Sequence, residues 1–257
     1  MLKLTNANYF SPEAMRDYWS VSQFKTFCKC EAQGLAEMRG EYVREETDSL
    51  LIGSYVDAYF SNELDEFTGK HADQMFTKKG ELYAKYSHAN EIIDYIEADD
   101  LMMEYLSGGK QQILTGELFE VPWKIKVDVL TDTRIVDLKI VKDFNKIYEE
   151  GYGQRPWVEY WGYDIQGAIY QEIVRQNTGK KLPFFIVAAT KEKTPDKNVI
   201  QIPQEVLDTA LMVVESKIDR FDLVKTGELP PCRCGSCDYC KLTKVLTEPA
   251  IYEPDLA

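Results

Sequence analysis

Residues 123–140 read WKIKVDVLTDTRIVDLKI, and this stretch decides the fold. Apolar and polar side chains alternate on either side of the polar connection TDTR, which is the pattern of two half-buried strands joined by a tight turn. If Thr131 pairs with Arg134, Asp128 falls directly opposite Asp137, because the residue numbers in both pairs sum to 265. The stretch therefore predicts a β-hairpin that brings two carboxylates together.

Two carboxylates in one hairpin need a compensating cation. The Cβ atoms of directly paired residues lie about 4.5–5.5 Å apart, and like charges at that spacing are destabilising. Lys139 shares the strand face of Asp137 and supplies one positive charge. A hard divalent ion such as Mg²⁺ or Mn²⁺ would supply more, since carboxylate oxygens are its preferred ligands. The alternative is an edge hairpin with a solvated polar face, in which the lysine neutralises one aspartate.

Regular elements extend from this hairpin in both directions. Alternation of apolar residues predicts strands over 111–120, 122–130 and 134–140, then a buried strand over 184–190 and a shorter one over 199–202. A period of 3.6 predicts helices over 49–62, 84–106, 158–177 and 204–225. The order helix, three strands, helix, strand predicts an α/β fold with a mixed central sheet flanked by helices.

The chain of 257 residues is expected to form one domain, 1–257. It comprises a mainly helical and polar N-terminal segment (1–48), a core (49–203), and a C-terminal helix with a cysteine-rich loop (204–257). A content of 44% hydrophobic residues excludes general disorder. No run approaches the ~20 apolar residues of a membrane helix, and the N-terminus lacks the apolar stretch of a signal peptide. We therefore expect a cytoplasmic protein with no membrane contact.

The net charge of −13 speaks against a general nucleic-acid binder, because phosphate binding leaves a basic footprint. The distribution of the charge weakens this objection. Residues 121–200 carry 13 Lys+Arg and 11 Asp+Glu, a balance of +2, so the rest of the chain carries −15. The charge pattern is therefore compatible with DNA binding that is weak, sensitive to salt and dependent on a metal ion.

Two polar residues stand out on the helix expected over 158–177. Gln166 and Tyr170 lie four residues apart and share a helix face. They lie beside an apolar stripe made of Trp161, Ile165, Ala168, Ile169 and Ile173. Taken alone, such residues are usually surface residues, and the two histidines, His71 and His88, are also expected at the surface.

The six cysteines are unevenly distributed. Two of them are Cys28 and Cys30, and the other four lie in the segment PPCRCGSCDYCK at 230–241, at Cys232, Cys234, Cys237 and Cys240. In a cytosolic chain, this spacing favours metal or cluster ligation over disulfide bonds. Thiolates suit both Zn²⁺ and iron–sulfur clusters, so the spacing leaves both open. An exposed cysteine-rich tail is the alternative.

The order of these residues resembles the PD-(D/E)xK nuclease superfamily. The matching motifs are Asp128, then Asp137-Leu138-Lys139, then Gln166-x-x-x-Tyr170. The last motif looks most like the Q-x-x-x-Y of the RecB-type branch. The segment from Ser20 to Cys30 is similar to the S-x-S-x-L-x-x-Y-x-x-C-P segment of that branch. The nearest match is to the RecE-like (exodeoxyribonuclease VIII) group of phage and prophage exonucleases, over roughly residues 20–241.

The resemblance implies a role for each matched residue. Asp128, Asp137 and the backbone carbonyl of Leu138 would bind one or two Mg²⁺ or Mn²⁺ ions. Asp57 would complete the shell, because it stands where the family's G-x-x-x-H motif has histidine. Lys139 would orient a water molecule or stabilise developing charge, and Gln166 and Tyr170 would position the phosphate backbone or the water. Arg155, beside Pro156, is a candidate phosphate contact, with a plain surface charge as the alternative.

The resemblance also implies a four-iron, four-sulfur (4Fe–4S) cluster bound by one N-terminal and three C-terminal cysteines. The matching residues are Cys30, Cys234, Cys237 and Cys240. Two departures from the family pattern bear on this cluster: Glu31 replaces the proline after the first cysteine, and the gap between the last two cysteines is shorter. Zn²⁺ therefore remains the second expectation for the bound metal.

The function implied is a metal-dependent DNA exonuclease acting in phage-type recombination or DNA repair. Its setting would be a bacterial or phage-infected cell. DNA would be the substrate, and a second copy of the chain and a single-strand annealing recombinase would be possible partners. Two alternative functions are not enzymatic. One is a non-catalytic DNA-binding module with this fold, and the other is a structural module built around an iron–sulfur or zinc site.

Overall fold

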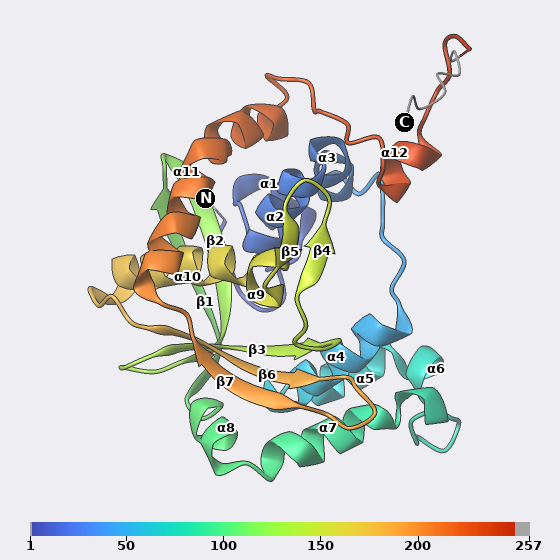
Figure 1. Cartoon of the computed structure of the whole chain (residues 1–257), viewed down its shortest axis with the longest axis vertical. Helices are drawn as coiled ribbons and strands as arrows, with labels where there is room; N and C mark the ends of the chain where they lie inside the picture. Colours follow the sequence, from blue (N-terminus) through green and yellow to red (C-terminus); the bar gives the residue numbers. More distant parts are fainter. Residues whose placement is uncertain (1, 250–257) are drawn as a thin grey trace.

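The computed structural model describes residues 2–249 and contains a five-stranded mixed sheet flanked by helices (Figure 1). The strand order is β1-β2-β3-β6-β7. The strands are β1 (Gly109–Leu118), β2 (Val121–Leu130), β3 (Ile135–Val141), β6 (Phe184–Thr190) and β7 (Lys197–Gln201). Only β3 and β6 pair in parallel. The mixed α/β fold expected from the sequence is confirmed. Residues 1 and 250–257 of the expected domain lie outside the described residues.

The strand that carries Asp137 and Lys139 lies inside the sheet. β3 pairs with β2 on one side and, over its whole length, with β6 on the other. Asp137 is 1% exposed. The alternative of a solvated edge hairpin is therefore wrong, because β6 and the helices on both faces remove this hairpin from water.

Helices cover both faces of the sheet (Figure 1). One face packs against α2 (Val21–Lys29), α3 (Glu31–Met38), α10 (Tyr163–Thr178) and α11 (Gln204–Thr226). The other packs against α4 (Asp48–Phe60), α7 (His88–Glu97) and α8 (Asp100–Tyr105). The sheet therefore has two hydrophobic cores, one on each face.

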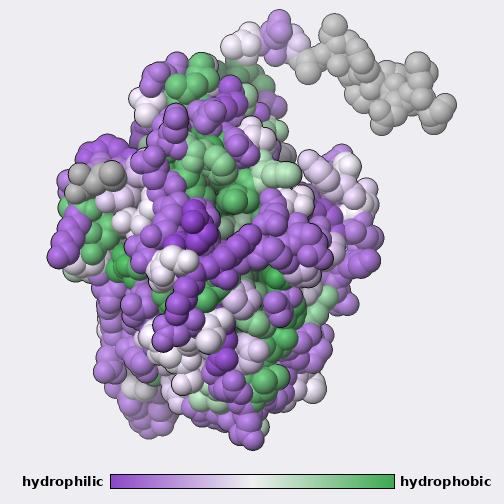
Figure 2. Space-filling model, turned by 90° about the vertical axis from the view of Figure 1, so that its left-hand side faces the viewer, coloured by the Kyte–Doolittle hydropathy of each residue, from purple (hydrophilic) through white to green (hydrophobic). Residues whose placement is uncertain are grey.

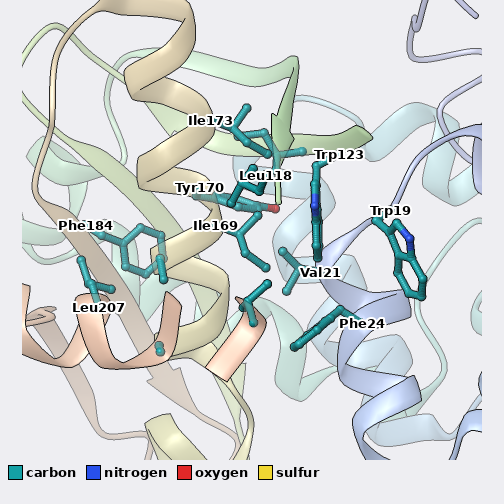
Figure 3. Packing of buried hydrophobic residues seen from close by; sticks show 14 of the residues in the cluster. Trp19, Val21, Phe24, Leu118, Trp123, Ile169, Tyr170, Ile173, Phe184 and Leu207 are labelled. Carbon is teal, nitrogen blue, oxygen red and sulfur yellow. The ribbon is translucent and has the colours of Figure 1, made fainter. Parts of the chain in front are cut away.

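The N-terminal segment is helical as expected but contributes to the core, so the expectation that it is polar is wrong. It contains α1 (Pro12–Asp17), α2 and α3. Figure 3 shows Trp19, Val21 and Phe24 pointing into the core with Trp123 of β2. The Trp19 N–H donates to the Pro122 carbonyl at 2.8 Å, and the Lys124 N–H donates to the Trp19 carbonyl at 2.8 Å. The segment is thus hydrogen-bonded to the edge of β2.

Two helices expected from the sequence are interrupted. The stretch 158–177 forms α9 (Trp157–Tyr160) and α10, separated at Gly162, whose φ of 64° is a left-handed value that favours glycine. This break turns Trp161 outward, so that it is 42% exposed and not part of the apolar stripe. The stretch 84–106 forms a short 3₁₀ turn, η1 (Ala84–Tyr86), followed by α7 and α8. Asp99 starts α8 by accepting a hydrogen bond from the Met102 N–H.

Five short elements were not expected from the sequence. They are α5 (Leu64–Lys70), α6 (Ala72–Met75), the hairpin of β4 (Ile147–Glu149) and β5 (Gly153–Arg155), and α12 (Asp238–Leu242). Each is too short to show a clear hydrophobic period. Seen from the side on which α11 lies in Figure 1, the surface is mainly hydrophilic with a hydrophobic area in its upper half (Figure 2). In residues 2–249, none of the helices combines the length and the apolar character needed to cross a membrane.

Candidate functional site

The two aspartates of the hairpin meet where β2 and β3 separate. The strands pair at Leu130↔Ile135 and Val129↔Val136, which is the register expected from the sequence. The ladder ends there, one residue before the expected pair of Asp128 and Asp137. Instead, Asp128 Oδ2 accepts a hydrogen bond from the Leu138 N–H at 2.9 Å. The Asp128 side chain thus replaces a backbone partner for β3 and lies against the D-L-K motif.

Helix α10 and Lys139 hold Asp137 from two sides. Gln166 Nε2 donates to Asp137 Oδ1 at 2.6 Å, inside the core. Lys139 Nζ lies 2.5 Å from Asp137 Oδ2, in a salt bridge. Both oxygens of Asp137 therefore have a partner, Oδ1 the Gln166 amide and Oδ2 the Lys139 ammonium group.

Asp57 comes from α4, which starts with Thr47 accepting a hydrogen bond from the Leu50 N–H. Its carboxyl group faces the same cavity as Asp128 and Asp137. This cavity has a volume of about 420 Å³. Its wall consists of Ser49, Leu50, Gly53, Ser54, Asp57, Asp128, Asp137, Leu138, Lys139, Ile140, Gln166, Tyr170 and Lys191. The structure therefore brings together all the residues expected to bind Mg²⁺ and all five expected catalytic residues.

A second cavity of about 460 Å³ adjoins the first. The two share Ser54, Asp57, Asp128, Gln166 and Tyr170 as lining residues. The second cavity also reaches Ser20, Ser22 and Lys25 on the N-terminal motif, together with His71. The expectation that His71 lies at the surface is wrong, because this side chain is buried.

Burial and charge both act on the acids in this site. Burial raises the pKa of Asp57 to about 6, with nearby Lys139 lowering it and Asp137 raising it. Burial, followed by repulsion from Asp137 and Asp57, raises the pKa of Asp128 well above its usual range. Burial acts to lower the pKa of Lys139, but attraction to Asp137 and Asp128 outweighs it, and the pKa is raised. Three carboxyl groups thus share the cavity with the ammonium groups of Lys139 and Lys191, and hard oxygen donors in negative excess fit a divalent cation.

Tyr170 and Gln111 are tied to the strands around Asp128. The Tyr170 hydroxyl donates to the Lys126 carbonyl at 3.0 Å, so it braces β2. Gln111 Nε2 donates to Ser61 Oγ at 2.6 Å and lies 3.5 Å from Asp128 Oδ1. Gln111 has a φ of 50°, a strained value for a non-glycine residue that is common beside functional sites. Sequence reasoning missed Gln111, and no sequence signal marks it, because its position depends on the pairing of β1 with β2.

Arg155 lies apart from the carboxyl groups. It belongs to β5, its guanidinium forms an ion pair with Glu149, and its Nη2 donates to the Glu159 carbonyl at 3.2 Å. It lines neither of the two cavities. The structure thus favours the reading of Arg155 as an ion-paired surface charge.

The four cysteines expected to bind a cluster come together. Cys30 lies between α2 and α3, and Cys234, Cys237 and Cys240 lie in and beside α12. The four sulfur atoms all lie within 4.8 Å of one another, close enough to bind one metal centre together. The other two cysteines, Cys28 and Cys232, are exposed. The reading of an exposed cysteine-rich tail is wrong for Cys240, which is buried beside Cys30, whereas Cys232 and Cys234 of the same segment are exposed.

Comparisons with known proteins agree with this geometry. Residues 20–243 match the family described as PDDEXK-like domain of unknown function (DUF3799). The crystal structure of a proposed exonuclease from Eubacterium rectale is 46% identical to this chain and has a TM-score of 0.93. The match covers 98% of this chain and 97% of that one. None of the curated proteins matches the chain significantly. The chain therefore belongs to the family of PDDEXK-like domains, as the order of its motifs indicated.

Proposed function

We propose that the protein is a metal-dependent nuclease that hydrolyses phosphodiester bonds in DNA, acting as an exonuclease. One observation carries the proposal: Asp128, Asp137 and Lys139 line a single cavity at the point where two central strands separate. The 46% identity to a proposed exonuclease supports the same reaction class. Asp137 is buried and Asp57 and Asp128 are partly buried, and withdrawing such charges from water destabilises a fold, so their presence favours a functional role.

The metal ligands in this proposal are Asp128, Asp137, the Leu138 carbonyl and Asp57. A bound Mg²⁺ or Mn²⁺ would polarise the scissile phosphate and lower the pKa of a water molecule. The chain provides the remaining parts. Lys139 Nζ now occupies the place next to these ligands, 2.5 Å from Asp137 Oδ2 and 3.3 Å from the Leu138 carbonyl that accepts from it. A bound cation would share Asp137 with this ammonium group or displace it.

Lys139 would stabilise the negative charge that develops on the phosphate, because it is the cation nearest to the carboxyl groups. Gln166 would act through Asp137, whose orientation it fixes. Tyr170 would act through β2, because its hydroxyl is bonded to a backbone carbonyl of that strand. These last two roles differ from direct contact with the phosphate, which the resemblance implies.

We also propose a branch of the nuclease superfamily and a cellular process for this protein. We place the whole chain, 1–257, in one nuclease domain of the RecB-like and RecE-like type, acting in phage-type recombination or DNA repair. A single-strand annealing recombinase and a second copy of the chain would be its partners. The motif from Ser20 to Cys30 supports this grouping, because Ser20 caps α2 at its start and Cys30 ends it beside the other cysteines.

The test uses linear duplex DNA labelled at either end. Purified protein with Mg²⁺ or Mn²⁺ should release nucleotides from an end, and the labelled end gives the polarity. Lys139→Ala should lower the rate about 100-fold or more, the size of effect expected when a charge-stabilising group is removed. Lys142→Ala is the matched control, because the Lys142 side chain is 93% exposed and lies just beyond β3.

Circular dichroism would show that both variants fold. Cleavage by Lys139→Ala at the wild-type rate would contradict the assignment of the site. DNA binding without cleavage under any divalent ion would favour the non-catalytic binding module instead.

A further inference from the structure

The spacing of the four clustered cysteines indicates how many metal atoms they can hold. Cys30 Sγ lies 3.5 Å from Cys240 Sγ, and Cys234 Sγ lies 4.0 Å from Cys240 Sγ. No pair among the four is further apart than 4.8 Å. Four sulfurs at Zn–S distances of about 2.3 Å around one tetrahedral ion are separated by about 3.8 Å. The observed spacing fits that arrangement.

A 4Fe–4S cluster needs more room. Each of its four cysteine sulfurs binds a different iron atom, so the whole core of iron and sulfide stands between them. Sulfurs that nearly touch, as Cys30 and Cys240 do, leave no space for that core. They are also too far apart for a disulfide, whose S–S distance is about 2.05 Å. We propose that Cys30, Cys234, Cys237 and Cys240 bind one tetrahedral zinc ion, and not the four-iron cluster that the family resemblance implies.

Backbone hydrogen bonds prepare the sulfurs for this role. The Cys237 N–H donates to Cys234 Sγ at 3.3 Å, and the Cys240 N–H donates to Cys237 Sγ at 3.4 Å. The Gln33 N–H lies 3.5 Å from Cys30 Sγ in the same kind of contact. Gly235, with a φ of 75°, allows the tight turn after Cys234. N–H groups aimed at the sulfurs orient these side chains as outer contacts orient metal ligands.

Four protein ligands leave no open coordination position, which is typical of a structural and not a catalytic zinc ion. The ion would join segments about 200 residues apart in the chain. Glu31, which stands where the family has proline, strengthens the same junction. Its carboxylate accepts from Arg220 Nε at 2.8 Å and from the Cys232 N–H at 2.7 Å. The Ala32 N–H donates to the Cys232 carbonyl at 3.0 Å.

The junction also reaches the candidate active site through α2. Cys30 ends this helix, and Ser20, Ser22 and Lys25 at its other end line the cavity beside Asp57 and Asp128. Loss of the ion should therefore loosen one wall of that cavity. The zinc assignment depends only on the cysteines. A protein without nuclease activity could still bind the zinc ion, so the two proposals are tested separately.

Elemental analysis of the full-length protein tests the proposal. Protein purified anaerobically and without a metal-affinity column should contain one zinc per chain, no inorganic sulfide and none of the visible absorption of an iron–sulfur cluster. Replacement by Co²⁺ should give the intense visible bands of a tetrahedral thiolate site. Iron with inorganic sulfide at several atoms per chain would overturn the proposal, as would the absence of any tightly bound metal.

Variants identify the ligands. Cys234→Ser and Cys240→Ser should lose the zinc, whereas Cys28→Ser and Cys232→Ser, which change the two cysteines outside the cluster, should keep it. If a ligand variant fails to fold, release of zinc by a thiol-modifying reagent from the double variant Cys28→Ser, Cys232→Ser shows that the remaining four cysteines hold the ion. Loss of zinc from the control variants to the same extent as from the ligand variants would contradict the assignment of ligands.

Discussion

At the scale of single residues, burial gives chemically identical side chains different properties. Lys139 is partly buried beside carboxyl groups, whose attraction outweighs burial and raises its pKa. Lys225 is buried with its Nζ donating to the Tyr18 carbonyl at 2.7 Å, over the ring of Trp19. Burial lowers the pKa of Lys225 to about 7, with Asp222 raising it and Lys124 lowering it further. The sequence motif marks Lys139 as a candidate site residue, whereas only the fold shows that Lys225 lies in the core.

The lowered pKa of Lys225 predicts a pH dependence of stability. Between about pH 7 and 10.5 the folded protein has released this proton while the unfolded chain still holds it. Because the unfolded state binds more protons, the contribution of Lys225 to the free energy of unfolding should rise with pH through that window. It should be lost as the pH falls through about 7.

Urea denaturation of the wild type and of Lys225→Met, at several pH values within this window, isolates the effect. The difference in free energy of unfolding, wild type minus variant, should increase by at least about 1 kcal/mol from the lower to the upper end, since one pKa unit corresponds to about 1.4 kcal/mol. Lys217→Met, on the same helix, is the control. Its difference in free energy of unfolding from the wild type should stay constant over this pH range. A flat difference for Lys225→Met as well would mean that the lysine keeps its ordinary pKa.

At the scale of elements, the packing of α10 fixes the position of Gln166. The next residue, Gly167, lies so close to β6 and α11 that an added Cβ would stand 2.5 Å from Phe184 Cδ1 and 2.9 Å from Leu207 Cδ2. Phe184 and Leu207 belong to the same hydrophobic cluster as Ile169 and Ile173 of α10 (Figure 3). A side chain at residue 167 must therefore push α10 away from the sheet, and Gln166 away from Asp137.

Gly167→Ala should destabilise the protein by about 1–3 kcal/mol through overpacking, although alanine favours a helix over glycine by about 1 kcal/mol. It should also lower the nuclease activity. Gly69→Ala in α5 is the matched control, because nothing lies within 4 Å of its added Cβ. That variant should be as stable as the wild type or slightly more so in chemical denaturation. Equal stability of the two variants would contradict the tight packing of α10.

Sequence patterns predicted elements well where local periodicity dominates. The strand over 184–190 matches β6, and the register of β2 with β3 is confirmed at Val129↔Val136. Sequence patterns failed where contacts with a distant part of the chain determine the structure. The N-terminal segment looked polar because its partner Trp123 lies about 100 residues away. The break at Gly162 was missed because an isolated glycine is tolerated in many helices.

The same limit applies to the candidate site. The hairpin alone indicated the pairing of Asp128 with Asp137, and the motif order added Gln166 and Cys30. The hydrogen bond of Gln166 to Asp137 depends on how α10 docks, and that of Asp128 to the Leu138 N–H depends on where two strands separate. These contacts lie beyond any local pattern, because they join elements whose relative position is set by the whole core.

At the scale of the whole molecule, the charge of −13 sets a condition for DNA binding. Asp57, Asp128 and Asp137 lie in the cavity where a phosphate would enter, and they would repel it. A divalent ion bound by these residues offsets most of the negative charge that the phosphate meets. We therefore expect the affinity for DNA to depend on the divalent ion through Asp128, and not through the overall charge alone.

Fluorescence anisotropy with a labelled short duplex can separate these two effects, using Lys139→Ala as the background so that the DNA stays intact. Mg²⁺ should tighten binding by this variant about tenfold or more over the metal-free protein, a coupling of about 1.4 kcal/mol. Adding Asp128→Asn should remove most of this gain. Adding Asp132→Asn should not, although it changes the net charge equally, because the side chain of Asp132 is 99% exposed at the tip of the hairpin. An equal response of both double variants to Mg²⁺ would show that the ion screens the whole molecule instead of binding at the carboxyl groups.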